Sequence, residues 1–422
     1  EKLGKKSEFE FESPNIRIER YPETFLLKAK GAIDCASSPC SNEETEPNRL
    51  KTLPKKGLWE EYTQKEKLGT KEKYTVKDRA GEYVSGKRNG IWKFFYETGE
   101  VIRETTYVSG KKEGLEKKFK QDGTVLEEIN YKDDLMDGPY WKKNRNGLLE
   151  KEGQYSKDKK TGLWREYYAE NADKVLKSVT IYVEDKKHGE EIRYYEDGKT
   201  VMSQGNFVDG LESGNWKYFY DNGSLESEGA FKPVESKIED ESDKDKPSDV
   251  KPKARKSGPW KKFYKNGNKF SEGMREGGCV GEWKFYHKTG KLAAKGNMSN
   301  DLMMQEGEWY DEDGLLAGKG KFMISIINID TKKDEIKRTY RPSKPFTIFK
   351  KGLKYLEITN VEKEGATVAY MFDDSGTKKI GEGPIEPNTQ KLNGCWQISG
   401  KNVYYLMGTV KEGALARMQK CE

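Results

Sequence analysis

The sequence predicts an all-β protein: an elongated antiparallel array of β-hairpin repeats, followed by a small C-terminal β domain. Three observations predict this class. A pattern of an opening glycine, an aromatic-rich run and a glycine-containing turn recurs along the chain. The opening glycines lie 23 to 44 residues apart, a spacing typical of repeat proteins. The chain is only 33% hydrophobic but 12% aromatic, which suits units that contact only their neighbours better than one large core.

The clearest repeat runs from Gly214 to Phe231. It contains two strand-like runs joined at Asn222-Gly223, and Asn-Gly is the strongest local hairpin signal because both central residues of a type I′ turn need positive φ. We therefore predict a two-residue turn at this site. The repeats open at ten glycines: Gly57, Gly90, Gly114, Gly138, Gly162, Gly189, Gly214, Gly258, Gly281 and Gly307.

A two-residue turn determines which residues face each other across the hairpin. It places Trp216 opposite Gly229, and we expect a large ring to cover the bare backbone of the glycine that faces it. The corresponding turns predict the pairs Trp260–Gly273, Trp283–Gly296, Trp309–Gly318 and Tyr140–Gly153, and two exceptions, Trp92–Thr105 and Glu116–Ile129.

The regions outside the repeats define the predicted domain organisation. Alternating apolar residues at 9–18 predict strands that cap the first edge of the sheet. A run rich in charges and prolines predicts a disordered insert within the array. The predicted parts are an N-terminal cap (1–56), hairpin repeats 1 to 7 (57–232), the charged insert (233–257), repeats 8 to 10 (258–320) and a C-terminal β domain (321–422), with a short helix near Ala414–Gln419.

The repeat motif resembles a known module. Gly-x-Trp-x-x-Phe/Tyr-Tyr-x-x-Gly, followed by a Leu…Glu-Gly strand, is similar to the MORN-variant repeat found in bacterial and antitoxin-like proteins. The motif is clearest at Gly90, Gly214, Gly258 and Gly281, and the resemblance covers residues 57–320. It implies an extended antiparallel sheet used for binding, and it implies no reaction and no particular partner.

Residues two, four and six positions after each opening glycine share one face of the sheet. This face carries a stripe of tryptophan and tyrosine, which is either the core between packed repeats or an exposed binding surface. The candidate binding residues are Trp92, Tyr96, Trp164, Tyr168, Trp216, Tyr220, Trp260, Tyr264, Trp283 and Trp309.

Charge and cysteine content indicate where the protein acts. A net charge of +6 from 78 basic and 72 acidic residues argues against nucleic acid as the ligand. No apolar run is long enough to span a membrane. The start at Glu1 and the cysteines predict a protein exported to the periplasm or outer surface of a bacterium, whose removed leader could carry a lipid anchor; a trimmed cytoplasmic chain is the alternative. The disulfide candidates are Cys35, Cys40, Cys395 and Cys421.

The sequence shows little catalytic chemistry. His188 and His287 are the only histidines, and Cys279 lies near His287 in sequence without a recognisable triad. The glycines recur at the repeat period rather than in a phosphate-binding loop. We therefore predict a non-enzymatic scaffold for protein–protein interaction, without metal or cofactor. A cytoplasmic antitoxin-like regulator and a protein that binds anionic lipid or glycan through the repeat sheet are the alternatives.

Overall fold

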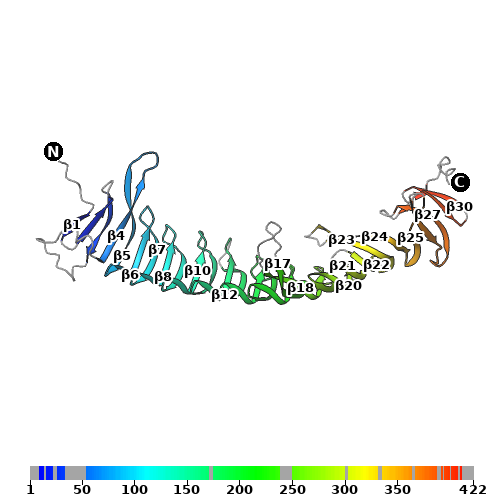
Figure 1. The fold of residues 1–422 in the computed structure, drawn as a ribbon, viewed down its shortest axis with the longest axis horizontal. Helices are drawn as coiled ribbons and strands as arrows, with labels where there is room; N and C mark the ends of the chain where they lie inside the picture. Colours follow the sequence, from blue (N-terminus) through cyan, green and yellow to red (C-terminus); the bar gives the residue numbers. More distant parts are fainter. Residues whose placement is uncertain are drawn as a thin grey trace. The chain divides into compact units, whose positions relative to one another are not determined.

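Every regular element in the described residues of the computed structural model is a β strand, which confirms the all-β antiparallel hairpin prediction (Figure 1). The structure describes residues 9–13, 16–21, 26–33, 54–170, 174–237, 250–299, 303–330, 335–363, 366–386, 391–392, 394–399, 401–406 and 409–410. The expected helix near Ala414–Gln419 lies outside these residues. The chain divides into two compact units, Glu1–Lys199 and Thr200–Glu422.

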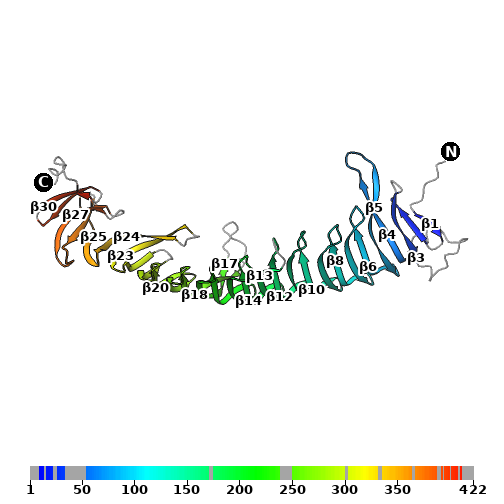
Figure 2. The same cartoon turned by 180° about the vertical axis from the view of Figure 1, so that it is seen from behind.

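In the first unit, each strand pairs antiparallel with the strand that follows it in the chain. The hairpin of β4 and β5 has the longest strands and projects beyond its neighbours, as Figure 2 also shows from behind. The strands are β1 (Phe9–Ser13), β2 (Ile16–Arg20), β3 (Leu27–Ile33), β4 (Lys55–Glu66), β5 (Lys73–Val84), β6 (Lys87–Phe95), β7 (Val101–Val108), β8 (Lys111–Phe119), β9 (Val125–Lys132), β10 (Leu135–Lys143), β11 (Leu149–Ser156), β12 (Lys159–Tyr168), β13 (Val175–Val183) and β14 (Lys186–Tyr194).

The second unit continues the same neighbour-to-neighbour pairing, except that β27 pairs with both β28 and β29. Its core is one cluster of buried side chains that runs from Trp260 to Trp396. The strands are β15 (Val201–Val208), β16 (Leu211–Phe219), β17 (Leu225–Lys237), β18 (Val250–Phe263), β19 (Lys269–Glu276), β20 (Gly278–Tyr286), β21 (Leu292–Ser299), β22 (Met303–Tyr310), β23 (Leu316–Asp330), β24 (Glu335–Lys350), β25 (Leu353–Lys363), β26 (Ala366–Phe372), β27 (Lys379–Glu386), β28 (Lys391–Leu392), β29 (Gly394–Ile398), β30 (Lys401–Leu406) and β31 (Thr409–Val410).

The domain boundaries predicted at 56/57 and 320/321 stay predictions. The predicted disordered insert needs correction at both of its ends. Residues up to Lys237 extend β17 and residues from Val250 extend β18, and the two strands pair as far as Lys237 opposite Val250. Pairing across the hairpin gives the backbone groups of this stretch hydrogen-bond partners, which its composition alone did not predict. Residues 238–249 lie outside the described part of the chain.

The hairpin turn at Asn222-Gly223 differs from the predicted one. The Gly223 N–H donates to the Tyr220 carbonyl at 2.9 Å, and the Tyr220 N–H donates to the Ser224 carbonyl at 2.8 Å. Gly223 has a φ of 80°, whereas Asn222 is not among the residues with positive φ. The loop therefore has three residues, a type I turn that ends in a left-handed glycine, rather than a two-residue type I′ turn.

Two-residue turns do occur, but at the opposite ends of the strands, where one hairpin passes to the next. Val108 pairs with Lys111, and Ser109 and Gly110 between them have φ values of 53° and 90°. This is the type I′ geometry. The same pairs of positive φ occur at Ser85-Gly86, Asp133-Asp134, Lys157-Asp158, Glu184-Asp185, Asp209-Gly210 and Lys351-Gly352.

All of the predicted facing pairs are confirmed. Trp216 faces Gly229 as predicted. The prediction succeeded although the turn was wrong, because the register shifts by one residue at a bulge between Tyr218 and Phe219 and so offsets the extra loop residue. The other confirmed pairs are Trp260–Gly273, Trp283–Gly296, Trp309–Gly318, Tyr140–Gly153, Trp92–Thr105 and Glu116–Ile129.

Candidate functional site

The tryptophan side chains share one arrangement with the strand before them. The Trp216 indole lies over Gly205, where a Cβ would be only 2.2 Å from Trp216 Cδ2, and its Nε1–H donates to the Asn206 carbonyl at 3.1 Å. The pairing of β15 with β16 is irregular at this point. The indole N–H therefore provides the Asn206 carbonyl with a hydrogen-bond donor where the strand pairing is interrupted. The rings and the glycines beneath them are Trp59–Gly31, Trp92–Gly81, Trp164–Gly153, Trp216–Gly205, Trp260–Gly229, Trp283–Gly273 and Trp396–Gly383.

These contacts correct two interpretations of the aromatic stripe. Most rings cover the glycine of the preceding strand rather than the glycine that faces them in their own hairpin, although Trp309 does lie over Gly318 as predicted. The rings are also core, because a side chain that is nearly inaccessible cannot form a binding surface. The six tryptophans proposed as binding residues have exposed fractions from 0% to 6%: Trp92, Trp164, Trp216, Trp260, Trp283 and Trp309.

A cation lies over several of these rings. Lys160 Nζ is 4.4 Å from the centre of the Trp164 ring, and Lys256 Nζ is 4.3 Å from the Trp260 ring. Both lysines stand two residues before an opening glycine, so these two repeats place the cation in the same way. Burial lowers the pKa of Lys160 and of Lys256, since it disfavours the charged ammonium.

The four candidate tyrosines join neighbouring repeats. Tyr264, 3% exposed, donates from its hydroxyl to the Tyr286 carbonyl at 2.9 Å. His287, at the same position of the next repeat, has Nε2 3.2 Å from the Tyr310 carbonyl, which gives this histidine a structural role. The other three bonds are Tyr96 to the Phe119 carbonyl, Tyr168 to the Tyr194 carbonyl and Tyr220 to the Phe263 carbonyl.

Two repeats replace the tryptophan with a buried glutamate. Glu116 is 1% exposed, accepts a hydrogen bond from Thr105 Oγ1 at 2.8 Å and pairs with Lys112 Nζ at 2.8 Å. Thr105 occupies the position at which most other repeats have glycine, and Lys112 occupies the position of the cation over the ring. Glu191 repeats the arrangement with Thr180 and Lys187. We call the three side chains that meet in this way a layer. In these two repeats all three members of the Gly–Trp–cation layer are replaced together, which gives a Thr–Glu–Lys layer.

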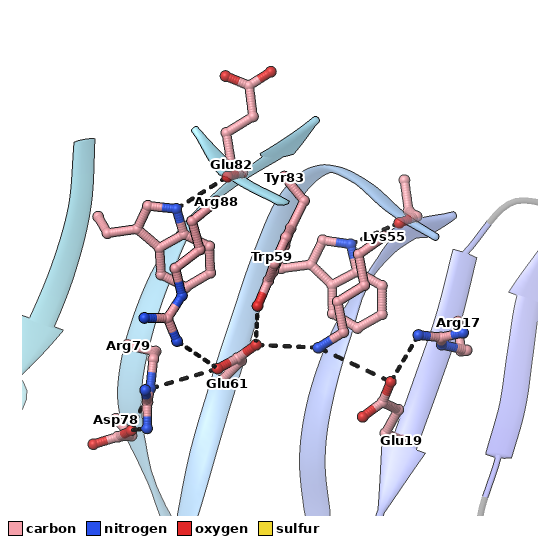
Figure 3. Close-up of polar contacts among 12 residues, drawn as sticks. Arg17, Glu19, Lys55, Trp59, Glu61, Asp78, Arg79, Glu82, Tyr83 and Arg88 are labelled. Atoms are coloured by element: carbon pink, nitrogen blue, oxygen red, sulfur yellow. Dashed lines mark hydrogen bonds and ion pairs between the residues drawn. The ribbon is translucent and has the colours of Figure 1, made fainter. Parts of the chain in front are cut away.

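A further network surrounds Glu61 near the first strands (Figure 3). Glu61 accepts a hydrogen bond from the Tyr83 hydroxyl at 2.8 Å and pairs with Lys55 at 3.1 Å, Arg79 at 3.5 Å and Arg88 at 3.9 Å. Burial raises the pKa of Glu61, but the Lys55 and Arg79 charges and the Tyr83 hydroxyl outweigh it, so the net effect lowers the pKa. These partners satisfy the carboxylate, which indicates a role in stability.

We expect Glu61→Gln to lower the free energy of unfolding by about 1–3 kcal/mol at pH 7, because the variant loses charge-assisted hydrogen bonds. A carboxyl whose pKa is lowered by folding stabilises the protein above its unfolded pKa, and this contribution is lost as pH falls through the folded pKa. The difference between wild type and variant should therefore shrink below about pH 4. Urea denaturation from pH 7 to pH 3 measures it, with the exposed Glu184→Gln as control. If the stability difference between wild type and Glu61→Gln stayed constant over this range, the ionised Glu61 carboxylate would not be the source of the stabilisation.

A cavity lies in the first unit on the same face of the sheet as the tryptophans. We call this cavity of about 760 Å³ the basic groove; it extends from Asp78 to Glu150. Its apolar lining comes from Phe94, Phe95, Ile102, Phe119 and Leu126. Five basic residues line it (Arg103, Lys118, Lys142, Lys143 and Arg145) against three acidic ones (Asp78, Glu127 and Glu150).

The three carboxylates of the basic groove are already paired. Glu127 lies 2.6 Å from Lys118 and accepts a hydrogen bond from Tyr140, Glu150 lies 3.4 Å from Lys142, and Asp78 pairs with Arg79. Although burial raises the pKa of Glu127, Lys118 and Tyr140 lower it overall, which keeps the carboxylate ionised. The pairs leave a surplus of positive charge on the other basic side chains.

The surplus belongs to Arg103, Lys143 and Arg145, which make no ion pair among the described residues. The Arg103 guanidinium carbon lies 4.0 Å from the centre of the Phe94 ring, and its buried Nε has no hydrogen-bond acceptor there. Tyr96 lines the same groove, so it is the predicted binding residue that the structure brings to the site.

In the second unit the same row of positions carries one charged side chain, Lys262, among uncharged ones. In the first unit the row across β7 to β12 reads Arg103, Lys118, Glu127, Lys142, Lys151 and Glu166. In the second unit the row across β16 to β21 reads Tyr218, Ser227, Lys262, Ser271, Phe285 and Ala294. The charged row is therefore a local property of the first unit rather than a requirement of the repeat.

The opposite face of the same strands carries paired charges. Lys93 lies 3.2 Å from Glu104, and Lys117 lies 3.3 Å from Glu128. Lys117 and Lys118 are consecutive residues of β8 and point to opposite faces, so this face has balanced charge beside the unbalanced groove. Sequence reasoning missed the groove because lysines interspersed with glutamates resembled a solvated edge. The available signal was the replacement of a ring by lysine four residues after Gly114 and Gly138.

The described part of the chain offers no other site of the predicted kinds. It contains no group of three histidine, cysteine or carboxylate residues placed to hold a metal ion. None of its segments forms a helix long and apolar enough to cross a membrane. Cys279 is buried and is not part of a disulfide. Cys35, Cys40 and Cys421 lie outside the described residues, so the predicted disulfides stay predictions.

Comparison with known proteins gives matches to a repeat model and to solved structures. No curated protein sequence matches the chain. The solved structure entitled "Crystal Structure of TcdB2-TccC3-Cdc42" is similar to 92% of this chain at 10% identity with a TM-score of 0.15, and this chain covers 26% of that one.

Five segments match the model of the MORN repeat variant: residues 88–109, 112–133, 187–209, 212–232 and 280–300. The segment at 112–133 is matched although its first strand carries Glu116 instead of tryptophan. Four of the five begin two residues before an opening glycine, which is the position of the cation in several repeats, and the fifth begins one residue later. Together with the repeated hairpins and their confirmed register, these matches identify the chain as a MORN-variant tandem-repeat protein.

Proposed function

We propose that this protein is a non-enzymatic scaffold that binds another protein through the basic groove. The observation that carries the proposal is the combination of an apolar lining with cations that have no ion pair among the described residues, at a row where the second unit has a single charged side chain, Lys262. Interfaces typically combine apolar area with arginine and aromatic side chains, and this combination suits them.

Affinity capture tests the proposal. We expect the full chain to retain a protein from the native cell envelope fraction, and the purified partner to bind again in a two-component assay. Arg103→Glu/Lys142→Glu should weaken that binding at least tenfold, because each reversal places a carboxylate where the partner meets a cation. Lys93→Glu/Lys117→Glu, with the same change in net charge on the opposite face, is the matched control and should bind like the wild type.

Three results would contradict the proposed function. No captured protein that binds again when purified would remove the scaffold role. Retention of anionic vesicles or of a glycan in place of any protein would replace it with one of the alternatives. Turnover of a captured molecule by the chain would contradict the non-enzymatic assignment.

We propose further that the protein acts at the envelope of a bacterium, and that the cysteine pairs support this location. Two disulfides would suit an oxidising compartment. Thiol titration of the unfolded, unreduced chain should then find one reactive thiol, from Cys279. Five reactive thiols would instead favour a cytoplasmic, antitoxin-like protein.

A further inference from the structure

The lining of the basic groove is partly apolar, and this favours ligands that carry apolar groups as well as charge. Phe94, Phe95 and Phe119 give it aromatic walls, and Ile102, 37% exposed, stands beside Arg103 on β7. A ligand that only carries charge would leave these apolar surfaces wet. A ligand with apolar groups between its charges would cover them, and covering them contributes favourably to binding.

The free cations of the groove need negative charge from outside the described residues. Arg103 is stacked on Phe94 without a carboxylate partner, and Lys143 and Arg145 extend the positive charge at the other end. A planar guanidinium on an aromatic face is well suited to a carboxylate, which it binds through two parallel N–H groups. The occupant should therefore present carboxylates at both ends of the groove.

The strand spacing sets the distance between those carboxylates. Lys142 on β10 marks the position of the second group of cations, because it lines the groove together with Lys143 and Arg145. It lies in one row with Arg103 on β7, three strand steps away. At about 4.8 Å a step this is about 14 Å. An extended chain rises about 3.3 Å per residue, so residues i and i+4 are about 13 Å apart and point to the same side.

We propose that the basic groove binds a short, extended segment of a partner protein with acidic side chains at positions i and i+4 and apolar side chains between and beside them. The inference rests on the scaffold function proposed above and assigns its partner a sequence pattern. One carboxylate meets Arg103, and the other meets the cluster of Lys142, Lys143 and Arg145, where Glu150 offsets only one of three positive charges. The apolar side chains cover Ile102 and Phe119.

A protein segment fits the groove better than the other polyanions do. The charged row ends in the acidic Glu166 on β12, so a long nucleic-acid backbone would meet a carboxylate within a few strands. The opposite face has balanced charge, and the surplus cations lie in a recess instead of on a protruding edge. Both features favour one short segment over a membrane surface.

A peptide display library tests the inference with the full chain as bait. Random nine-residue peptides selected on the wild type should be enriched in sequences with Asp or Glu at i and i+4 and apolar residues around them. A synthetic peptide of the enriched sequence should bind at least tenfold more weakly to Arg103→Glu/Lys142→Glu than to Lys93→Glu/Lys117→Glu. A peptide of equal composition with its two acidic residues adjacent should also lose at least tenfold, and added salt should weaken the specific complex.

The outcomes separate this inference from the proposed function. Enrichment of basic or neutral peptides, absence of any enriched sequence, or equal losses in the groove variant and its control would overturn the inference. Vesicles with anionic headgroups that bind in a groove-dependent way while no peptide does would also overturn it. A purified partner that binds the groove variant as tightly as wild type would sink the inference alone, since the scaffold would then use another surface. Circular dichroism of each variant verifies that its strands are intact.

Discussion

Replacing Trp260 with alanine should lower the stability of the second unit by about 3–5 kcal/mol, because it empties a buried site and removes a hydrogen bond. Trp260 is 4% exposed, lies over Gly229, and donates to the Ala230 carbonyl at 3.1 Å. Since repeat arrays open locally rather than all at once, hydrogen exchange of the amides in β17 to β19 is the appropriate measurement. Met274→Ala, at a side chain 46% exposed on β19, is the control and should change little.

The companion change Gly229→Ala shows whether the ring over the glycine matters. Alanine normally stabilises a strand relative to glycine. Here its Cβ would lie 2.2 Å from Trp260 Cδ2, so we expect a loss of about 1–3 kcal/mol instead. In a Trp260→Ala background the penalty should disappear, and a double-mutant cycle measures this coupling. Additive effects of the two changes would show that the contact does not determine stability.

Lys112→Met should have an effect of similar size in the first unit, about 3–5 kcal/mol, because it leaves a buried carboxylate without its counter-charge. Glu116 is 1% exposed, and Lys112 lies 2.8 Å from it. The adjacent Lys111 pairs with Asp133 at 2.7 Å, but both side chains are more than half exposed, so Lys111→Met should cost little. Urea denaturation of both variants compares them directly, and equal costs would refute the assignment.

Replacing the Thr–Glu–Lys layer with a Gly–Trp–cation layer should preserve the stability of the protein. Thr105→Gly/Glu116→Trp, with Lys112 retained, rebuilds the Gly–Trp–cation arrangement that Gly81, Trp92 and Arg88 form two strands away. We expect this variant to be as stable as the wild type or more stable, since a buried ion pair is often replaced by apolar packing without loss. The single change Glu116→Trp should be worse than the pair, because Thr105 would occupy the space that the indole needs.

The sequence alone predicted the register of the hairpins, but not which glycine each ring covers. Trp216 has Gly205 on one side and Gly229 on the other, since successive repeats place glycine at the same position. The local sequence pattern is the same around Gly205 and Gly229, so it does not show which of the two glycines the ring covers. The choice depends on the bulge beside Gly205, where the indole N–H finds the Asn206 carbonyl, and such a break in the ladder has no sequence signature beyond the opening glycine.

The sequence correctly predicted that two-residue turns occur, but we placed them at the wrong ends of the strands. Asn222-Gly223 has the composition of a two-residue turn, yet the structure uses Asp221 as a third loop residue. The true two-residue turns include Lys157-Asp158, which has no glycine and adopts positive φ at both residues. Pairing of the flanking strands determines the backbone there, so local composition was a poor guide.

The candidate site was less predictable than the fold. The aromatic stripe suggested a binding surface because its residues are large, whereas the charged row of the site includes Lys118 and Lys142, which look like ordinary surface lysines. Their position in the repeat distinguishes them, because the second unit has rings, Tyr218 and Phe285, at two of its three corresponding positions and lysine at only one, Lys262. That comparison requires the repeats to be aligned by register, which the confirmed facing pairs now provide.

The exchange of layers as sets has a consequence for how such chains grow. Each layer takes its glycine or threonine from one strand and its ring or carboxylate from the next, so a duplicated stretch of 24 residues, the interval from Gly90 to Gly114, carries half of a layer at each end. A copy inserted beside a Gly–Trp layer again places a tryptophan over a glycine. A copy inserted beside Thr105 and Glu116 instead places a tryptophan against a threonine or a glutamate against a glycine. Gene duplication should therefore be tolerated at some boundaries and rejected at others, and the two glutamate layers mark the boundaries at which length is hardest to change.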